Sequence, residues 1–289
     1  MKILVGVISE YSADDAMALA AVLQQAFGAQ VVLGTIYAHS ADTAGTRKVN
    51  AEWVQYLKAD AADVLQEASD DAPKSGLVEF ETAMHGHRSS GVGLAELAAQ
   101  VEADLIVIGS APGSANGRFL IGSTADQLLH GSHVPVALAP AGYRRVRPES
   151  LGRMMVAFQD TAESRRALQW AAEHADGRTV TALTVLMRHR VMGSQHSFDT
   201  ENLVVQQARE DAQAALDEAL ADMGADAQSL ITAGDDTQSA LQRVDWLGDE
   251  LLILASARGG VLRRVFLGDM TYKLVRATPV PAVVLPRHT

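Results

Sequence analysis

One pattern of residues occurs twice in this chain of 289 residues, from Asp104 to Pro140 and again from Glu250 to Pro286, a step of 146 residues without a gap. Each occurrence has an apolar run, a loop that contains glycine, a glycine before a helical pattern, and a valine-proline pair that opens a second apolar run. A fixed internal period indicates duplication. The sequence therefore predicts two copies of one domain.

The apolar runs predict the fold class. Residues 105–108 and 251–254 are apolar without alternation, which is typical of parallel strands covered by helices on both faces. Strands alternate with helical patterns, so each copy is predicted to be an α/β domain with a doubly wound, five-stranded parallel sheet. The predicted domains are 1–141 and 153–289, joined by a linker over 142–152. The strands are expected at 2–8, 30–37, 77–84, 104–109 and 134–139, and then at 153–159, 178–186, 228–232, 250–255 and 280–285.

Composition excludes several classes of partner. The formal net charge is −11, so neither nucleic acid nor an acidic membrane surface is an expected partner. The chain has no cysteine, which excludes disulfides and thiol chemistry. No apolar run approaches the roughly 20 residues that span a bilayer, and the first predicted strand follows Met1 directly. A cytoplasmic location is expected.

The loop after the fourth strand is the first candidate for a ligand site. Parallel sheets bind ligands beyond the carboxyl ends of their strands. Here the loop is rich in small residues and ends at Gly122, Ser123 and Thr124, where a helical pattern starts. Glycine lets a ligand approach the backbone, and a helix N-terminus attracts anions. The alternative interpretation is a surface loop that ends in a serine N-cap.

This spacing resembles the universal stress protein family, in which the fourth strand is followed by a glycine, two residues, a glycine, nine residues and then Gly-Ser or Gly-Thr. Gly109 and Gly122-Ser123 stand at the outer positions, whereas Pro112 replaces the second glycine and Gly113 follows it. The segments 123–136 and 270–282 also resemble the family, so the likeness covers the chain twice, as in tandem members.

The resemblance implies how the two copies associate and what the first copy binds. The last strands, 134–139 and 280–285, would pair antiparallel as an internal pseudo-twofold dimer, and a further homodimer is an open alternative. The implied ligand is ATP or a related adenine nucleotide, with Mg²⁺ as its possible companion. The residues expected near the adenosine are Ile8, Ser9, Ile36 and Tyr37, and those expected around the phosphates are Gly109, Ser110, Gly113, Gly122, Ser123 and Thr124.

Two departures from the family pattern weaken this expectation. ATP-binding members carry an aspartate at the end of the first strand, where this chain has Ile8 and, in the second copy, Gln159. In the second copy Ala255 and Arg258 replace the two loop glycines, and Asp269 replaces the serine or threonine. Asp269 would repel a phosphate unless the nearby arginines at 258, 263 and 264 offset it. A purely structural second copy is the favoured interpretation.

No catalytic constellation is present in the sequence. His85 and His87 are two residues apart, but a third metal ligand is not evident, so we expect loop histidines rather than a metal site. Without a nucleophile or an acid–base pair, the chain is not expected to be an enzyme beyond slow incidental ATP hydrolysis. The expected function is a nucleotide-binding protein of the stress response. The alternative is a stress protein without nucleotide that binds protein partners, whose identity the sequence does not indicate.

Overall fold

The computed structural model describes residues 1–7, 10–39, 47–187, 197–221, 223, 227–256 and 269–286. The chain divides into two compact units, of which unit 1 contains Met1–Ser150 and unit 2 begins at Leu151. Each unit contains a five-stranded sheet in which every described pairing is parallel. The predicted doubly wound α/β architecture is confirmed in both copies.

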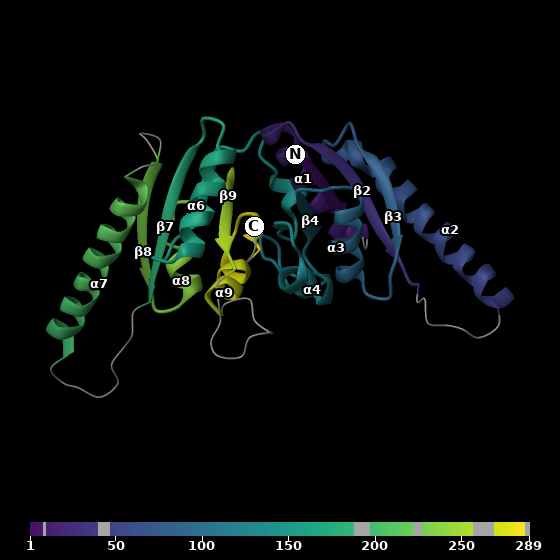
Figure 1. The fold of residues 1–289 in the computed structure, drawn as a ribbon. Helices are drawn as coiled ribbons and strands as arrows, with labels where there is room; N and C mark the ends of the chain where they lie inside the picture. Colours follow the sequence, from purple (N-terminus) through teal and green to yellow (C-terminus); the bar gives the residue numbers. More distant parts are fainter. Residues whose placement is uncertain are drawn as a thin grey trace. The chain divides into compact units, whose positions relative to one another are not determined.

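Unit 1 has the strand order β3-β2-β1-β4-β5. Helices α1 and α2 pack on one face of this sheet, and α3 and α4 pack against each other on the other face (Figure 1). The elements are β1 (Lys2–Gly6), α1 (Glu10–Phe27), β2 (Gln30–Tyr37), α2 (Arg47–Asp71), the 3-10 helix η1 (Ala72–Ser75), β3 (Glu81–Gly86), α3 (Ser90–Gln100), β4 (Leu105–Gly109), α4 (Ser123–Gly131), β5 (Val136–Ala139) and α5 (Tyr143–Val146).

The buried strands explain why this sequence forms a covered parallel sheet. All residues of β4 from Leu105 to Ile108 are at most 2% exposed, which agrees with their lack of alternation. The strand β5 lies at one edge of the sheet of its own unit, as predicted, and β10 (Ala282–Leu285) does so in unit 2. The pairing of these two edges stays a prediction.

The third strand starts later than its apolar sequence predicts. We expected a strand over 77–84, but β3 begins at Glu81, where it pairs with Val32 of β2. Leu77 instead follows η1 and is fully buried in front of the strand. Gly76 allows this path because it has a φ of +82°, a left-handed conformation that favours glycine.

The segment after β5 is packed onto unit 1. The carboxylate of Asp15 in α1 accepts hydrogen bonds from the backbone N–H groups of Gly142 (2.8 Å) and Arg144 (2.9 Å). The side chain of Arg147 donates to the carbonyl oxygen of Ser75 in η1. Tyr143, which belongs to this segment, is itself buried, and that burial raises the pKa of its hydroxyl. Residues 142–147, which we predicted to be linker, therefore form a part of unit 1.

Unit 2 repeats the topology with the strand order β10-β9-β6-β7-β8. Its elements before β10 are β6 (Arg153–Ala157), α6 (Ala162–His174), β7 (Thr179–Met187), α7 (Ser197–Leu220), β8 (Ala227–Gly234), α8 (Thr237–Leu241), β9 (Glu250–Ala255) and α9 (Asp269–Ala277). Glu250, the first residue of β9, is buried and accepts a hydrogen bond from Arg153 of β6 at 2.5 Å.

The N-terminus of α8 gives unit 2 a pH-dependent contribution to stability. Asp236 accepts a hydrogen bond from the backbone N–H of Ser239 (2.7 Å), and the hydroxyl oxygen of Ser239 accepts one from Asp236 N–H (3.1 Å). Hydrogen bonds from the backbone and then the side chain of Ser239 lower the pKa of the Asp236 carboxyl from its ordinary 3.8. Because the pKa of this carboxyl is lower in the folded than in the unfolded protein, its ionised form stabilises the fold at a pH above the unfolded-state pKa. That contribution is lost as the pH falls through the folded-state pKa.

We therefore expect wild type to lose stability relative to Asp236→Asn below pH of about 4. Asparagine is a comparable N-cap but has no titrating group in this range. The measurement is the urea midpoint of unit 2 as a function of pH in the two proteins. A difference in midpoint that stays constant from neutral pH to pH of about 2 would contradict the predicted linkage.

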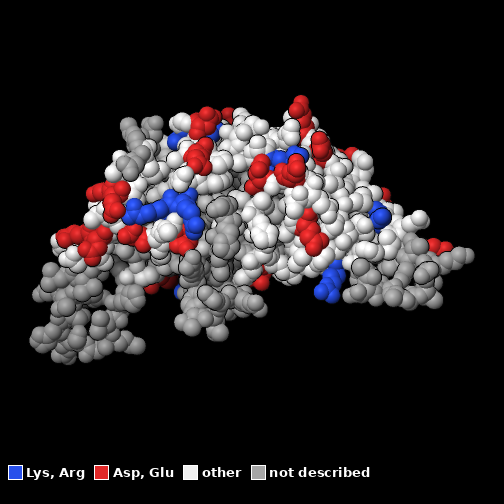
Figure 2. Space-filling model, viewed as in Figure 1, with Lys and Arg blue, Asp and Glu red and all other residues white. Residues whose placement is uncertain are grey.

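Helix length and surface charge bear on the classes of partner that composition excluded. None of the helices in the described ranges is both long and apolar enough to cross a bilayer. Figure 2 shows acidic and basic side chains interspersed over the face in view, with acidic side chains in the majority. This distribution matches the negative formal charge of the chain.

Candidate functional site

The loop between β4 and α4 is closed at its base by its own hydrogen bonds. Gly109 ends β4, and the next residue, Ser110, is 6% exposed. The Ser110 hydroxyl oxygen accepts a hydrogen bond from Leu120 N–H (2.8 Å), while Ala111 N–H donates to the Leu120 carbonyl (3.1 Å). Ser110 therefore holds the two ends of the loop together, a role that its sequence position did not reveal.

Two left-handed glycines and a backbone hydrogen bond define the conformation of the loop over residues 112–117. Gly113 and Gly117 adopt left-handed conformations, with φ of +85° and +71°. Pro112 cannot adopt such a conformation because its ring fixes φ near −65°. This restriction accounts for the left-handed residue at position 113, one place after the second glycine of the family pattern. Gly117 N–H donates to the carbonyl of Ala141 (2.7 Å), which fastens the loop to the chain after β5.

The start of α4 provides the candidate anion site. Gly122 is the N-cap of this helix and offers no side chain to cap it. Among the described residues, the backbone N–H groups and hydroxyls of Ser123 and Thr124 have no hydrogen-bond partner. These groups, together with the positive end of the helix dipole, can bind a phosphate or another anion. The predicted helix start at Ser123 is confirmed.

A further contact, which the sequence did not indicate, orients α4. The side-chain oxygen of Gln127 accepts hydrogen bonds from the Ser89 hydroxyl (2.5 Å) and from Gly91 N–H (3.1 Å) at the start of α3. A Cβ atom on Gly91 would lie 2.6 Å from Gln127 Cβ, so glycine is required for this close approach. The glycine at position 91 was the available signal, but its partner is 36 residues away along the chain.

The predicted adenosine side of the site is only partly described. Ile36 packs toward α3, because a Cβ on Gly93 would lie 2.8 Å from its side chain. The Tyr37 ring lies against Gly86, with Lys58 Nζ 5.7 Å from the ring centroid. Both side chains are thus used in packing at the end of β2. The other two predicted residues, 8 and 9, lie outside the described residues.

The histidines at the end of β3 have protein partners. His85 Nε2 lies 2.8 Å from a carboxylate oxygen of Glu96, and its Nδ1 lies 3.2 Å from the side-chain nitrogen of Gln100. His87 Nδ1 accepts a hydrogen bond from Ser89 N–H at the start of α3 (2.9 Å). The described ranges contain no group of three His, Asp or Glu side chains suited to a metal ion.

A cavity of about 390 Å³ lies beside the loop in unit 1. Its walls are the first half of the loop, the segment after β5, and Asp15 of α1. Arg144 and Arg145 of α5 also line it. We call it the α5 cavity. The sequence does not reveal this cavity, because the two arginines lie in the predicted linker and Asp15 resembles the other acidic residues of its helix.

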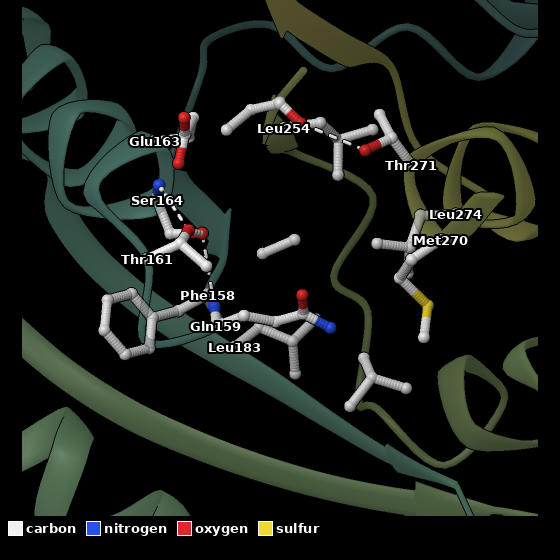
Figure 3. A pocket seen from close by; sticks show the side chains of 13 residues that line it. Phe158, Gln159, Thr161, Glu163, Ser164, Leu183, Leu254, Met270, Thr271 and Leu274 are labelled. Atoms are coloured by element: carbon white, nitrogen blue, oxygen red, sulfur yellow. Dashed lines mark hydrogen bonds between the residues drawn. The ribbon is translucent and has the colours of Figure 1, made fainter. Parts of the chain in front are cut away.

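Unit 2 has a separate cavity at the start of α9, the helix that corresponds to α4 in the sequence repeat. This cavity measures only about 50 Å³ and lies at the carboxyl ends of β6, β7 and β9, between the starts of α6 and α9 (Figure 3). Figure 3 shows Phe158, Gln159 and Leu183 on one side and Met270 and Leu274 on the other. Ligand cavities for small molecules usually measure about 300–1,000 Å³. The side chains of Arg258, Arg263, Arg264 and Asp269 lie outside the described residues.

Comparison with known proteins agrees with this architecture. The model of the universal stress protein family matches residues 1–140 and 151–286. A universal stress protein of Mycobacterium tuberculosis H37Rv is 30% identical over 294 residues, covering 99% of this chain and 100% of the relative. A universal stress protein of Mycobacterium bovis shows the same identity and coverage.

Among solved structures, a universal stress protein from Archaeoglobus fulgidus has a TM-score of 0.63 and covers 98% of each chain at 17% identity. That identity supports a likeness in fold alone. The family model and the full-length relatives carry the assignment further, because they match both copies. This chain therefore belongs to the universal stress protein family, with two of its domains in tandem.

Proposed function

We propose that unit 1 binds ATP or a related adenine nucleotide, and that the protein acts in the stress response by binding rather than by catalysis. The observation that carries the proposal is the start of α4, where the N–H groups and hydroxyls of Ser123 and Thr124 have no partner within the described ranges and lie next to the loop after β4. The described residues of unit 2 leave a cavity of only about 50 Å³ at the start of α9, well below the usual range for small-molecule sites, which favours one site per chain.

The first test replaces Gly122 by glutamate. The new carboxylate would lie at the helix start, where it repels a phosphate and occupies the space beside Ala111, whose Cβ lies 3.0 Å from a Cβ on Gly122. We expect wild type to bind about one equivalent of ATP and Gly122→Glu to lose binding at least tenfold. The measurement is isothermal titration calorimetry with Mg²⁺, with folding checked by circular dichroism.

The matched control is Gly131→Glu. This variant adds the same charge at the other end of the same helix, where a Cβ has no neighbour within 4 Å. Gly131→Glu should bind ATP like wild type. Failure of wild type to bind millimolar ATP, or binding of two equivalents, would contradict the proposal.

A second candidate function is that of a protein-interaction module. It is favoured by Trp53 and Tyr56 on α2, which are 58% and 59% exposed and stack with ring centroids 5.3 Å apart. Exposed aromatic side chains are common at protein interfaces. If wild type binds no nucleotide, the test is affinity capture from a stressed lysate with wild type and a Trp53→Ala, Tyr56→Ala variant. A partner captured equally by both proteins would count against this surface.

A further inference from the structure

The α5 cavity has a size and a wall structure suited to a ligand. Its volume of about 390 Å³ lies within the usual range for small-molecule sites, about 300–1,000 Å³. The loop wall is held by the Ser110, Ser114 and Gly117 hydrogen bonds, in which Ser114 Oγ donates to the Arg118 carbonyl at 2.9 Å. The opposite wall is held by the bonds from α5 and its N-cap to Asp15. A ligand would therefore meet a preorganised surface.

The charged side chains around the cavity differ in whether they already have hydrogen-bond or ion-pair partners. Both carboxylate oxygens of Asp15 accept backbone hydrogen bonds, and the residue is only 7% exposed. The guanidinium of Arg144 pairs with Asp14. Arg145 is exposed, and its side chain has neither a hydrogen bond nor an ion pair with the residues that the structure describes. Among the charged groups of the wall, Arg145 is the one without a counter-charge.

The loop adds further hydrogen-bond donors to this wall. The backbone N–H groups of Gly113 and Ser114 have no acceptor in the described ranges. Gly113 adopts its left-handed conformation directly after Pro112, and successive N–H groups at such a turn can form an anion-binding concavity. The cavity thus combines an unpaired guanidinium with free backbone donors, a combination that suits phosphate oxygens.

The α5 cavity adjoins the proposed nucleotide site, because Ser110 and Gly113 line it and were also predicted to surround the phosphates. We propose that the α5 cavity binds the terminal phosphate of the nucleotide, with Arg145 donating to it. This inference rests on the proposed function and adds a preference for triphosphates. Such a preference would depend on α5, a helix that lies outside the loop motif of the family.

The test compares ligands that differ only in their phosphates. We would measure the affinities of adenosine, AMP and ATP by calorimetry for wild type, Arg145→Ala and Arg145→Lys. Arg145→Ala should bind ATP about tenfold more weakly, since a charge-assisted hydrogen bond is lost. Its affinity for adenosine should not change. Arg145→Lys should recover part of the ATP affinity, because it keeps the charge but not the planar fork.

The control is Arg166→Ala in unit 2, which removes the same charge from a side chain that is 50% exposed. It should bind ATP like wild type. Equal ATP affinity in wild type and Arg145→Ala would overturn the inference, as would an equal loss of adenosine and ATP affinity in that variant.

Titration with inorganic tripolyphosphate separates this inference from the proposed function. If wild type binds tripolyphosphate but neither ATP nor adenosine, and Arg145→Ala loses that binding, the cavity is a phosphate site and the nucleotide proposal fails. If ATP binds and is lost in Gly122→Glu but not in Arg145→Ala, the nucleotide proposal stands and the role of Arg145 fails. If wild type binds none of these ligands, both fail.

Discussion

Glu250→Ala should lower the free energy of unfolding of unit 2 by about 3–5 kcal/mol, since removing one partner of a buried ion pair leaves the other charge uncompensated. The Glu250 side chain is fully buried. It accepts hydrogen bonds from Arg153 (2.5 Å) and from the backbone N–H groups of Leu247 and Gly248 (2.8 Å each). Alanine would leave all three donors without this acceptor.

Urea unfolding followed by tryptophan fluorescence measures this loss, because Trp170 and Trp246 both belong to unit 2. Glu250→Gln should lie between wild type and alanine, because its amide nitrogen would face one of the three donors. Glu173→Ala removes an exposed glutamate from α6 and should change stability by no more than about 0.5 kcal/mol. A loss below about 1 kcal/mol for Glu250→Ala would show that the buried pair contributes little.

Asp15→Ala should destabilise unit 1 by about 2–4 kcal/mol, because it leaves two N–H groups without their charged acceptor. These are the N–H groups of Gly142 and Arg144, which Asp15 binds at 2.8 and 2.9 Å. The loss should release α5 from α1. Hydrogen exchange of the amides at 142–147, together with urea unfolding followed by far-ultraviolet circular dichroism, measures both effects.

The adjacent residue provides the control for this prediction. Asp14 pairs with the side chain of Arg144, which is 43% exposed. Partly exposed ion pairs contribute about 0.2–1 kcal/mol, so Asp14→Ala should cost much less than Asp15→Ala. Equal losses in the two variants would mean that the backbone hydrogen bonds to Asp15 are not the dominant contribution.

Patterns within single segments of the sequence predicted the elements that those segments form. The unalternating run at 105–108 predicted a buried parallel strand, and all four of these residues are buried in β4. The start of β3 was predicted too early because of Leu77. This residue is buried before the strand begins, and the sequence alone does not distinguish such a residue from an apolar residue within the strand.

The sequence predicted only the part of the candidate site that is formed by neighbouring residues of one segment. Gly122, Ser123 and Thr124 are contiguous, so the start of α4 could be recognised from sequence. The α5 cavity depends instead on Asp15 meeting residues 127 and 129 positions away, and no local pattern reports such a contact. Arg144 resembled a residue of a solvated linker because its partners, Asp14 and Asp15, come from α1.

The small cavity at the start of α9 bears on how the chain would respond to the proposed nucleotide. Cooperative, sigmoidal responses require at least two sites whose occupancies are coupled. A chain with one open site gives a hyperbolic response, in which occupancy follows ligand concentration gradually over a wide range. A duplicated chain in which only one copy binds the ligand would therefore change its occupancy gradually with ligand concentration and would show no threshold.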